Sequence, residues 1–351
     1  MAIMETHLEG AEKGAELPPP LLPDERLRLS HAEAVRVDAP TFAEDVRRGL
    51  TSSPKFLFPK YFYDDLGSRL FEAITALPEY YPTRAEAEIL KNHADEIVGA
   101  LGGPVWLLEL GSGDGQKTRL MIEALIARQG ALEYVPVDIS ESAVVGSSRS
   151  LLFSYPELRI TAYVGEYHRA LRKIRQERVA PGRTLVLFLG STLGNLDPEE
   201  RRVLLRDVRA LLNPGEGFLL GLDLKKPESV LIPAYDDALG VTAAFDLNLL
   251  VRINRELGGE FDLRAFRHKA IYNAPKGRVE MHLESRKDQT VTIRDLGLEV
   301  SFAQGETIHT ESSHKFDREQ IAALAADTGF ELRQMWTDSE GRFASNLLIA
   351  E

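Results

Sequence analysis

The spacing of apolar residues along the chain changes several times, and each change predicts a different kind of structure. The first 31 residues mix Glu, Gly and Lys around Pro18, Pro19 and Pro20 with little periodicity, which predicts a disordered segment over 1–31. Within 43–50 and 68–76 the apolar residues recur at helical spacing around a cluster of aromatic side chains. A packed helical unit is therefore expected before residue 84.

Between residues 105 and 224 short apolar runs alternate with helical patterns. Strands are predicted at 105–108, 134–139, 160–164, 184–189 and 218–224, with helices such as 141–152 and 199–212 between them. Alternating strands and helices of this length indicate a parallel sheet that is covered on both faces. The predicted fold class is α/β, with a Rossmann-like sheet.

The alternation ends beyond Lys225. A long helix is predicted at 241–257, and short alternating segments at 266–272, 279–284, 290–293, 299–302 and 307–313 predict a meander. A helix at 318–326 follows, and strands at 332–336 and 344–349 flank a turn at 338–341. These last strands are expected to close the parallel sheet with an antiparallel edge.

A glycine-rich stretch lies directly after the strand at 105–108. It reads ELGSGDG over 109–115, and a helical pattern starts near Lys117. Because glycine tolerates positive φ and close approach, such a turn can bring main-chain N–H groups up to a nucleotide-like ligand. The spacing differs from the G-x-G-x-x-G of dinucleotide binders. An ordinary surface turn is the alternative interpretation.

Two further polar positions follow predicted strands at the same edge of the sheet, where ligands of parallel sheets bind. Asp138 could accept both ribose hydroxyls of a nucleotide-like cofactor, or it could cap the helix at 141–152. In the loop at 190–195, the amide of Asn195 can bind a carboxylate, and the carbonyl of Gly190 could orient an amine. A capping role for Asn195 is less suitable, because Asp197 fills it better.

Strand alternation assigns side chains to faces in the meander. Glu311 and Ser313 are expected to face one ligand together, while Ser312 points away. On the preceding strand, alternate residues are expected to form an apolar face (Val279, Met281 and Leu283) and a solvent face (Glu280, His282 and Glu284). This alternation also separates four residues of metal-ligating type (His282, His309, Glu311 and His314), so no metal is expected.

Composition narrows the functional class. The 351 residues carry a net charge of −12, which predicts neither a nucleic-acid substrate nor an anionic membrane surface as partner. The absence of cysteine excludes disulfides and thiolate chemistry and fits a reducing cytoplasm. No apolar run is long enough to span a bilayer. We therefore expect a cytoplasmic protein. A monomer is also expected, although nothing in the composition bears on the oligomeric state.

Several collinear segments resemble the histidine-specific N-alpha-methyltransferases of ergothioneine biosynthesis. They are PKYFYD (59–64), LPEYYPTR (77–84), FLGSTLGN (188–195), AYDD (234–237) and TESSHKF (310–316). The resemblance runs from about residue 40 to the C-terminus. It implies a class I methyltransferase sheet with a second α+β substrate-binding domain, built from 32–84 and 226–314. The methyltransferase domain would comprise 85–225 and 315–351.

The resemblance also implies roles for individual residues. The S-adenosylmethionine site would contain the glycine turn with its neighbours, and Glu166-Tyr167 falls where the family usually has Asp-Phe beside adenine; these residues are Gly111, Ser112, Gly113, Lys117, Asp138, Glu166 and Tyr167. Asn195 and Tyr235 would hold the substrate carboxylate, with Gly190 near the amine. Glu311 and Ser313 would bind the imidazole, and Tyr63, Phe71, Tyr80 and Met281 would line the pocket.

The implied activity is transfer of up to three methyl groups to the α-amine of L-histidine, which gives hercynine. Asn195, Gly190 and Tyr63 would act on the reacting amine, and Tyr63 through a water is the candidate proton acceptor. Fungal relatives of the family methylate tryptophan derivatives, so another amino acid is the alternative substrate. A module that binds S-adenosylmethionine only as a signal is a second alternative, although a second pocket would then be superfluous.

Overall fold

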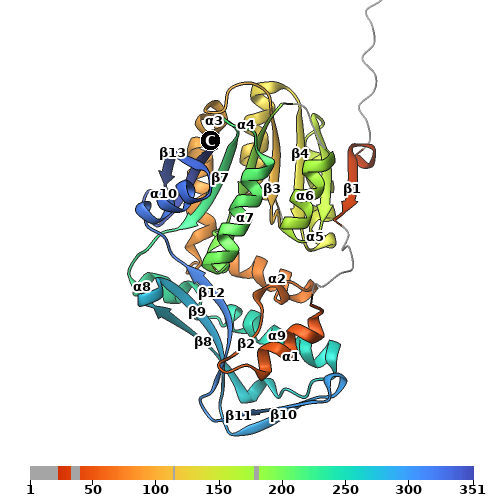
Figure 1. Cartoon of the computed structure of the whole chain (residues 1–351), viewed down its shortest axis with the longest axis vertical. Helices are drawn as coiled ribbons and strands as arrows, with labels where there is room; N and C mark the ends of the chain where they lie inside the picture. Colours follow the sequence, from red (N-terminus) through yellow and green to blue (C-terminus); the bar gives the residue numbers. More distant parts are fainter. Residues whose placement is uncertain (1–22, 33–39, 114, 178–181) are drawn as a thin grey trace, which may run out of the picture.

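The computed structural model describes residues 23–32, 40–113, 115–177 and 182–351, and its upper part in Figure 1 is built on an eight-stranded sheet. The strand order is β1 (Leu27–His31), β5 (Leu158–Val164), β4 (Leu132–Asp138), β3 (Val105–Leu110), β6 (Arg183–Phe188), β7 (Gly217–Asp223), β14 (Phe343–Ala350) and β13 (Phe330–Thr337). The first six strands are parallel, and β14 is antiparallel to both of its neighbours. The α/β fold class and the terminal hairpin are therefore confirmed.

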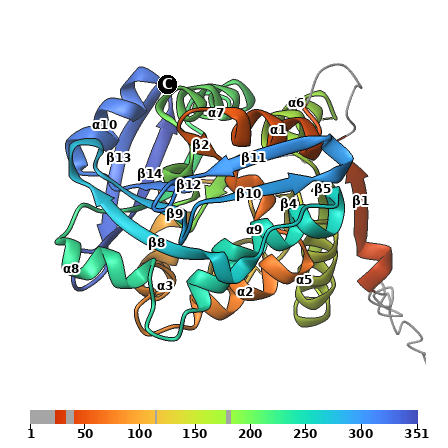
Figure 2. The same ribbon diagram turned by 90° about the horizontal axis from the view of Figure 1, so that it is seen from below.

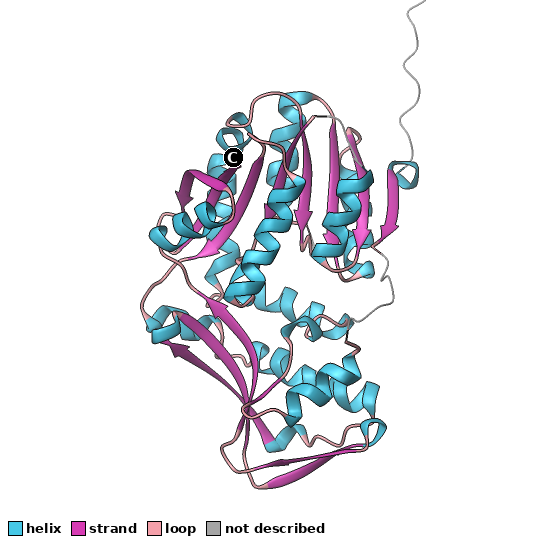
Figure 3. Ribbon diagram, in the orientation of Figure 1, coloured by secondary structure: helices cyan, strands magenta, loops and turns pink. Residues whose placement is uncertain are grey.

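Helices cover both faces of this sheet (Figure 3). One face packs against α3 (Tyr81–Gly99), α4 (Thr118–Gln129) and α5 (Glu141–Ser154), and the other against α6 (Tyr167–Glu177), α7 (Pro198–Leu211) and α10 (Arg318–Asp327). Successive residues of β3 enter the two cores alternately: Val105 and Leu107 one, Trp106 and Leu108 the other. A strand buried on both faces reads as a continuous apolar run, as the sequence does over 105–108.

The lower part in Figure 1 is formed by two separate stretches of chain. The first supplies α1 (Phe42–Thr51), β2 (Lys55–Phe56) and α2 (Asp65–Thr75), and the second supplies α8 (Glu228–Leu231), α9 (Val241–Leu257), β8 (Phe266–Asn273), β9 (Arg278–Ser285) and β12 (Thr307–His314). Four strands form a sheet in the order β2-β12-β9-β8. Both stretches contribute to one hydrophobic core, in which Phe62 stacks on Phe245 with ring centroids 4.4 Å apart.

The predicted meander is wrong in one respect. The segments β10 (Gln289–Ile293) and β11 (Leu298–Phe302) form a separate two-stranded ribbon with one further bridge, from Ile293 to Gly259, whereas β12 pairs directly with β9. Figure 2 shows this ribbon from below. Its buried residues Val291, Ile293, Val300 and Phe302 join the same core as α9, so it folds under the helix instead of extending the sheet.

The prediction of disorder over 1–31 is wrong for Leu27–His31, which forms β1 and pairs in parallel with β5; residues 1–22 lie outside the described residues. The guanidinium of Arg26 fastens this edge by donating to the main-chain oxygens of Leu152, Tyr155 and Leu158 at 2.6, 2.8 and 2.9 Å. A strand of five residues that is held by its neighbours leaves too little periodicity to be recognised.

The predicted solvent face of β9 is also wrong, because Glu280 and Glu284 are only 7% and 8% exposed. Glu284 pairs with Arg267 and Lys269 of the adjacent strand β8, and Glu280 pairs with Arg278. Long cationic side chains therefore cover these carboxylates. Alternation along one strand cannot reveal partners on the neighbouring strand, such as Arg267 and Lys269.

Candidate active site

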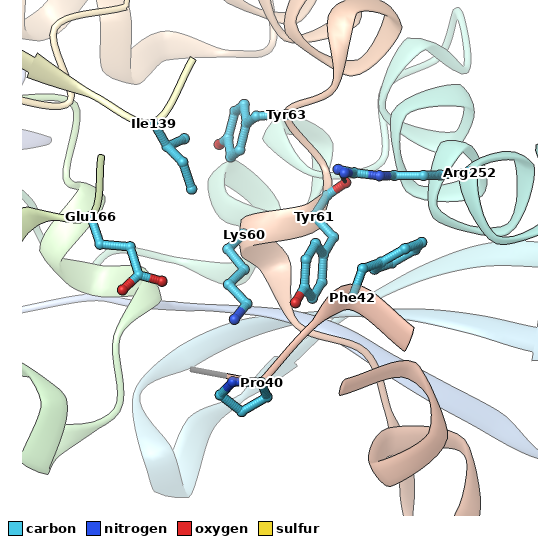
Figure 4. A pocket seen from close by; sticks show the side chains of 8 residues that line it. All are labelled: Pro40, Phe42, Lys60, Tyr61, Tyr63, Ile139, Glu166 and Arg252. Carbon is cyan, nitrogen blue, oxygen red and sulfur yellow. Dashed lines mark hydrogen bonds between the residues drawn. The ribbon is translucent and has the colours of Figure 1, made fainter. Parts of the chain in front are cut away.

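A cavity of about 360 Å³ opens where the two parts of the molecule meet. Ile139 and Glu166, which follow strands of the large sheet, line one wall. Tyr63 and Lys60 from the N-terminal stretch and Arg252 from α9 line the other (Figure 4). Two predicted site residues, Tyr63 and Glu166, therefore border one space, at the carboxyl-end edge of the parallel strands where ligands bind.

The glycine turn after β3 is shaped for close approach. Gly111 and Gly113 have φ of +70° and +50°, which favours glycine. A side chain at Gly111 would place its Cβ 2.8 Å from the hydroxyl of Tyr167, so this tyrosine closes over the turn. The hydroxyl of Ser112 is buried without a hydrogen-bond partner among the described residues. An orphaned hydroxyl and a Cβ-free turn fit a bound polar ligand such as S-adenosylmethionine.

Asp138 lies beside this turn at the end of β4. Its carboxylate accepts hydrogen bonds from the N–H of Gly113 at 3.1 Å and the N–H of Ser140 at 2.9 Å. Burial raises the pKa of Asp138 above its ordinary value. The N-cap of α5 is Ser140, whose hydroxyl accepts from Ala143 N–H. Asp138 is therefore not the N-cap of α5, and a role in a cofactor site stays a prediction.

Lys117 is held by a residue that no sequence pattern indicated. Its ammonium pairs with the carboxylate of Glu86, which comes from α3 and is fully buried. The same carboxylate accepts from the N–H of Gly190 at 2.8 and 3.1 Å. Glu86 thus links Lys117, at the start of α4, to the loop at 190–195.

The predicted substrate residues Asn195, Glu311, Ser313 and Tyr235 come together. The Asn195 amide donates to the Glu311 carboxylate at 3.0 Å, and the Ser313 hydroxyl lies 2.7 Å from the Tyr235 hydroxyl. Ser312 instead contacts the ring of His309, so the predicted shared face of Glu311 and Ser313 is confirmed. Burial, and then the charge of Asp246, raise the pKa of Glu311 to about 8.

Aromatic rings connect the remaining predicted residues. Ring centroids are 5.6 Å apart between Tyr63 and Phe71, 6.1 Å between Phe71 and Tyr80, and 6.5 Å between Tyr80 and Tyr235. Phe245 of α9, which was not predicted, contacts both Tyr63 and Phe71. Burial, and then the charge of Glu311, raise the pKa of Tyr63 well above its usual range, so this phenol is neutral at pH 7.

Met281 lies directly opposite Glu311 in the β9–β12 register and is buried in the core of the lower part. A pocket-lining role is therefore compatible with a packing role here. The carboxylate of Glu166 is partly exposed, and its ion-pair partners are His168 and Arg169, each at 3.6 Å. Neither partner is one of the predicted site residues.

A buried charged cluster in contact with Tyr235 and Ser313 was also missed. Asp223, at the end of β7, pairs with Lys315 at 2.7 Å and with Lys226, and it accepts from the Tyr81 hydroxyl. Burial acts to raise the pKa of Asp223, but the two ammonium groups hold it below its ordinary value. A second buried pair joins His268 to Asp246 at 2.7 Å.

Two negative findings apply to the part of the chain that the structure describes. No group of three or more His, Asp or Glu side chains is arranged to hold a metal ion. No helix within 23–32, 40–113, 115–177 and 182–351 has the length and apolar character needed to cross a membrane.

Asp138→Ala is expected to weaken S-adenosylmethionine binding by about 5- to 150-fold, since a lost hydrogen bond to a charged group costs ~1–3 kcal/mol. Isothermal calorimetry measures the dissociation constant. Glu141→Ala is the matched control, because Glu141 is an exposed carboxylate three residues away that contacts His31. An unchanged dissociation constant in a folded Asp138→Ala protein would remove Asp138 from the cofactor site.

The sequence of the chain is similar to those of several known methyltransferases. A family described as histidine-specific methyltransferase, SAM-dependent, matches residues 42–350. The chain is 43% identical over 323 residues to histidine N-alpha-methyltransferase of Mycolicibacterium smegmatis, covering 92% of this chain and 99% of that protein. It is 29% identical to ergothioneine biosynthesis protein 1 of Schizosaccharomyces pombe, covering 65% of this chain and 30% of that protein. It is 26% identical to 4-dimethylallyltryptophan N-methyltransferase of Claviceps purpurea, covering 91% and 96%.

Proposed function

The chain belongs to the family of histidine-specific, S-adenosylmethionine-dependent methyltransferases, and we propose that it methylates the α-amine of L-histidine up to the trimethylated betaine. This would be the first step of ergothioneine biosynthesis. The protein acts on a small molecule, and we include in the proposal that it works as a cytoplasmic monomer without a nucleic-acid partner.

One observation carries the choice of histidine. Glu311 and Ser313 present a carboxyl group and a hydroxyl from one face of β12, and Asn195 donates to that carboxyl group. A buried pair of this kind suits a ring with two polar nitrogens. An indole would leave one of the two groups without a partner, which costs ~1–3 kcal/mol. The relative that acts on a tryptophan derivative is also the less similar one, at 26% against 43% identity.

The proposed reaction gives each of the predicted site residues a role. S-adenosylmethionine, when bound, supplies a methyl group on a positively charged sulfur; Gly111, Ser112, Gly113, Lys117, Asp138, Glu166 and Tyr167 would hold it. Asn195 and Tyr235 bind the substrate carboxylate, and Gly190 and Tyr63 face the amine. The amine must lose its proton before each transfer, and Tyr63 passes that proton to solvent through a water. Holding the reactants in place supplies most of the rate.

The aromatic lining is suited to the product. Tyr63, Phe71 and Tyr80 form a connected set of rings, of which Tyr63 lines the cavity. Aromatic faces attract quaternary ammonium groups, with a gain of about 0.5–2 kcal/mol per contact. The pocket can therefore accept an amine that gains bulk and a fixed positive charge.

Mass spectrometry of a reaction with histidine and excess S-adenosylmethionine tests the proposal. Sequential mono-, di- and trimethylated histidine is expected, with the trimethylated form accumulating. Histamine, which lacks the carboxylate, should be a poor substrate. Accumulation of monomethylhistidine alone would contradict trimethylation, and cofactor binding without any methyl transfer would favour a sensor that binds S-adenosylmethionine only as a signal.

A further inference from the structure

Lys315 is a fully buried lysine that contacts two of the proposed substrate-binding residues, Tyr235 and Ser313. Its side chain has no exposed surface, and its ammonium contacts Asp223 at 2.7 Å, the Tyr235 hydroxyl at 2.7 Å and the Ser313 hydroxyl at 2.9 Å. It also lies over the Tyr235 ring, 4.6 Å from the centroid. Tyr235 and Ser313 are the residues proposed to read the carboxylate and the ring of the substrate.

The hydrogen bonds that the Tyr235 and Ser313 hydroxyls already make limit the donors and acceptors that they can present to a ligand. An ammonium has three N–H donors, and a hydroxyl has one donor and two acceptor positions. Lys315 therefore uses all its donors on Asp223, Tyr235 and Ser313. The 2.7 Å contact between the Tyr235 and Ser313 hydroxyls consumes one of their two hydrogens. One donor and one acceptor position remain, and they lie on different residues.

We propose that Lys315 is a positioning residue that clamps Tyr235 and Ser313 together, so that Tyr235 donates to the substrate carboxylate while Ser313 only accepts, from a ring N–H. This inference rests on the proposed function. The second ring nitrogen then faces Glu311. When the ligand is bound, its ring and the Glu311 carboxyl group together carry two protons. One lies on the ring nitrogen beside Ser313, and the other is shared between the second ring nitrogen and the Glu311 carboxyl group.

Glu311 is able to share such a proton. Its pKa is raised to about 8 by burial and by the charge of Asp246, while Lys315 acts to lower it. The other titratable groups that face it are phenols, whose pKa values are all raised by burial: Tyr63, Tyr80 and Tyr235. Asp246 is itself paired with His268. In the free protein at pH 7, Glu311 therefore already carries the proton that the bound ring needs.

The pH dependence of ligand binding tests this proton count. The probe is the trimethylated histidine betaine, because its quaternary nitrogen has no proton to lose, and calorimetry is done with S-adenosylhomocysteine present. Binding is expected to be tightest between about pH 6.5, the imidazole pKa, and about pH 8, where Glu311 ionises. Above that range the affinity should fall about tenfold per pH unit, because one proton must be taken up. Tighter binding at pH 9 than at pH 7 would overturn the proposal, since Ser313 would then donate to a neutral ring.

Two substitutions distinguish a positioning role of Lys315 from a role in stabilising the fold. Lys226 is the matched control, because it pairs with the same Asp223 carboxylate but contacts neither Tyr235 nor Ser313. Lys315→Met should weaken betaine binding at least tenfold at pH 7 and leave S-adenosylhomocysteine affinity unchanged. In Lys315→Met, the affinity for the betaine should also begin to fall at a higher pH than in wild type, because Lys315 no longer lowers the pKa of Glu311. Lys226→Met should change none of these.

Equal effects of Lys315→Met and Lys226→Met on betaine affinity would show that Lys315 only supports the fold. If Lys315→Met does not fold, the wild-type pH profile still decides the question. Failure of the proposed function is a separate result, because it appears as absence of methylated histidine in the mass spectra, whatever the betaine profile.

Discussion

Glu311→Ala is expected to lower the affinity for histidine by about 5- to 150-fold and to reduce the preference for histidine over other amino acids. The substitution leaves a ring nitrogen without a partner in a buried site, which costs ~1–3 kcal/mol. It also removes the acceptor of the Asn195 amide, which lies 3.0 Å away. An aromatic amino acid without a second ring nitrogen loses nothing from the change, so the ratio of affinities should move toward tryptophan.

A competition assay measures this selectivity. Wild type, Glu311→Ala and a double variant with Met281→Val are given histidine, methylated histidines, tryptophan and tyrosine together. Met281 faces the core directly opposite Glu311, so trimming it should admit a bulkier indole. Ser312→Ala is the matched control, because its hydroxyl points to His309 on the other face. Wild-type preference for tryptophan would defeat the histidine assignment, and unchanged selectivity in Glu311→Ala would place ring recognition elsewhere.

Local patterns in the sequence predicted the elements well, because those patterns are set by burial of one face. The helix at 241–257 has the bounds of α9 as observed, and the strand at 307–313 differs from β12 by one residue. The shared face of Glu311 and Ser313 followed from alternation alone. A bulge in β12 between His309 and Glu311 puts His309 on the face of Ser312, so alternation would have placed His309 wrongly.

Long-range pairing was beyond reach of the sequence alone. Glu86 and Lys117 are 31 residues apart, and Asp223 and Lys315 are separated by a whole stretch of the lower part. In the sequence each of these looks like a solvated charge, because most Lys and Glu residues are exposed. Only the return of the chain from the lower part to the large sheet brings Lys315 to the end of β7. Its position inside the TESSHKF segment, two residues after Ser313, was the one available signal.

Glu86→Ala is expected to destabilise the folded protein by about 3–5 kcal/mol, the cost of breaking a buried ion pair on one side. The loss leaves the Lys117 ammonium without its carboxylate and the Gly190 N–H without its acceptor. The loop at 190–195 loses its anchor to α3, so kcat should fall as well. Glu86→Gln keeps an acceptor for Gly190 but loses the charge, and it should retain more activity than Glu86→Ala. Asp95→Ala, at an exposed carboxylate on the same helix, should change neither stability nor kcat.

Gly221 packs directly against the Glu86 carboxylate, so a substitution there tests the position of that carboxylate. A Cβ at Gly221 would lie 1.9 Å from Oε1 of Glu86, and that carboxylate cannot move aside easily because Lys117 and Gly190 hold it. Gly221→Ala alone should therefore be destabilising, whereas its added cost in a Glu86→Ala background should be smaller, since of these close contacts only the one with the Phe343 ring, 3.2 Å from the new Cβ, then remains. Urea unfolding of wild type, the two single variants and the double variant measures the coupling free energy. Additive costs would mean that the carboxylate does not occupy this position, and the link from Lys117 through Glu86 to Gly190 would have to be abandoned.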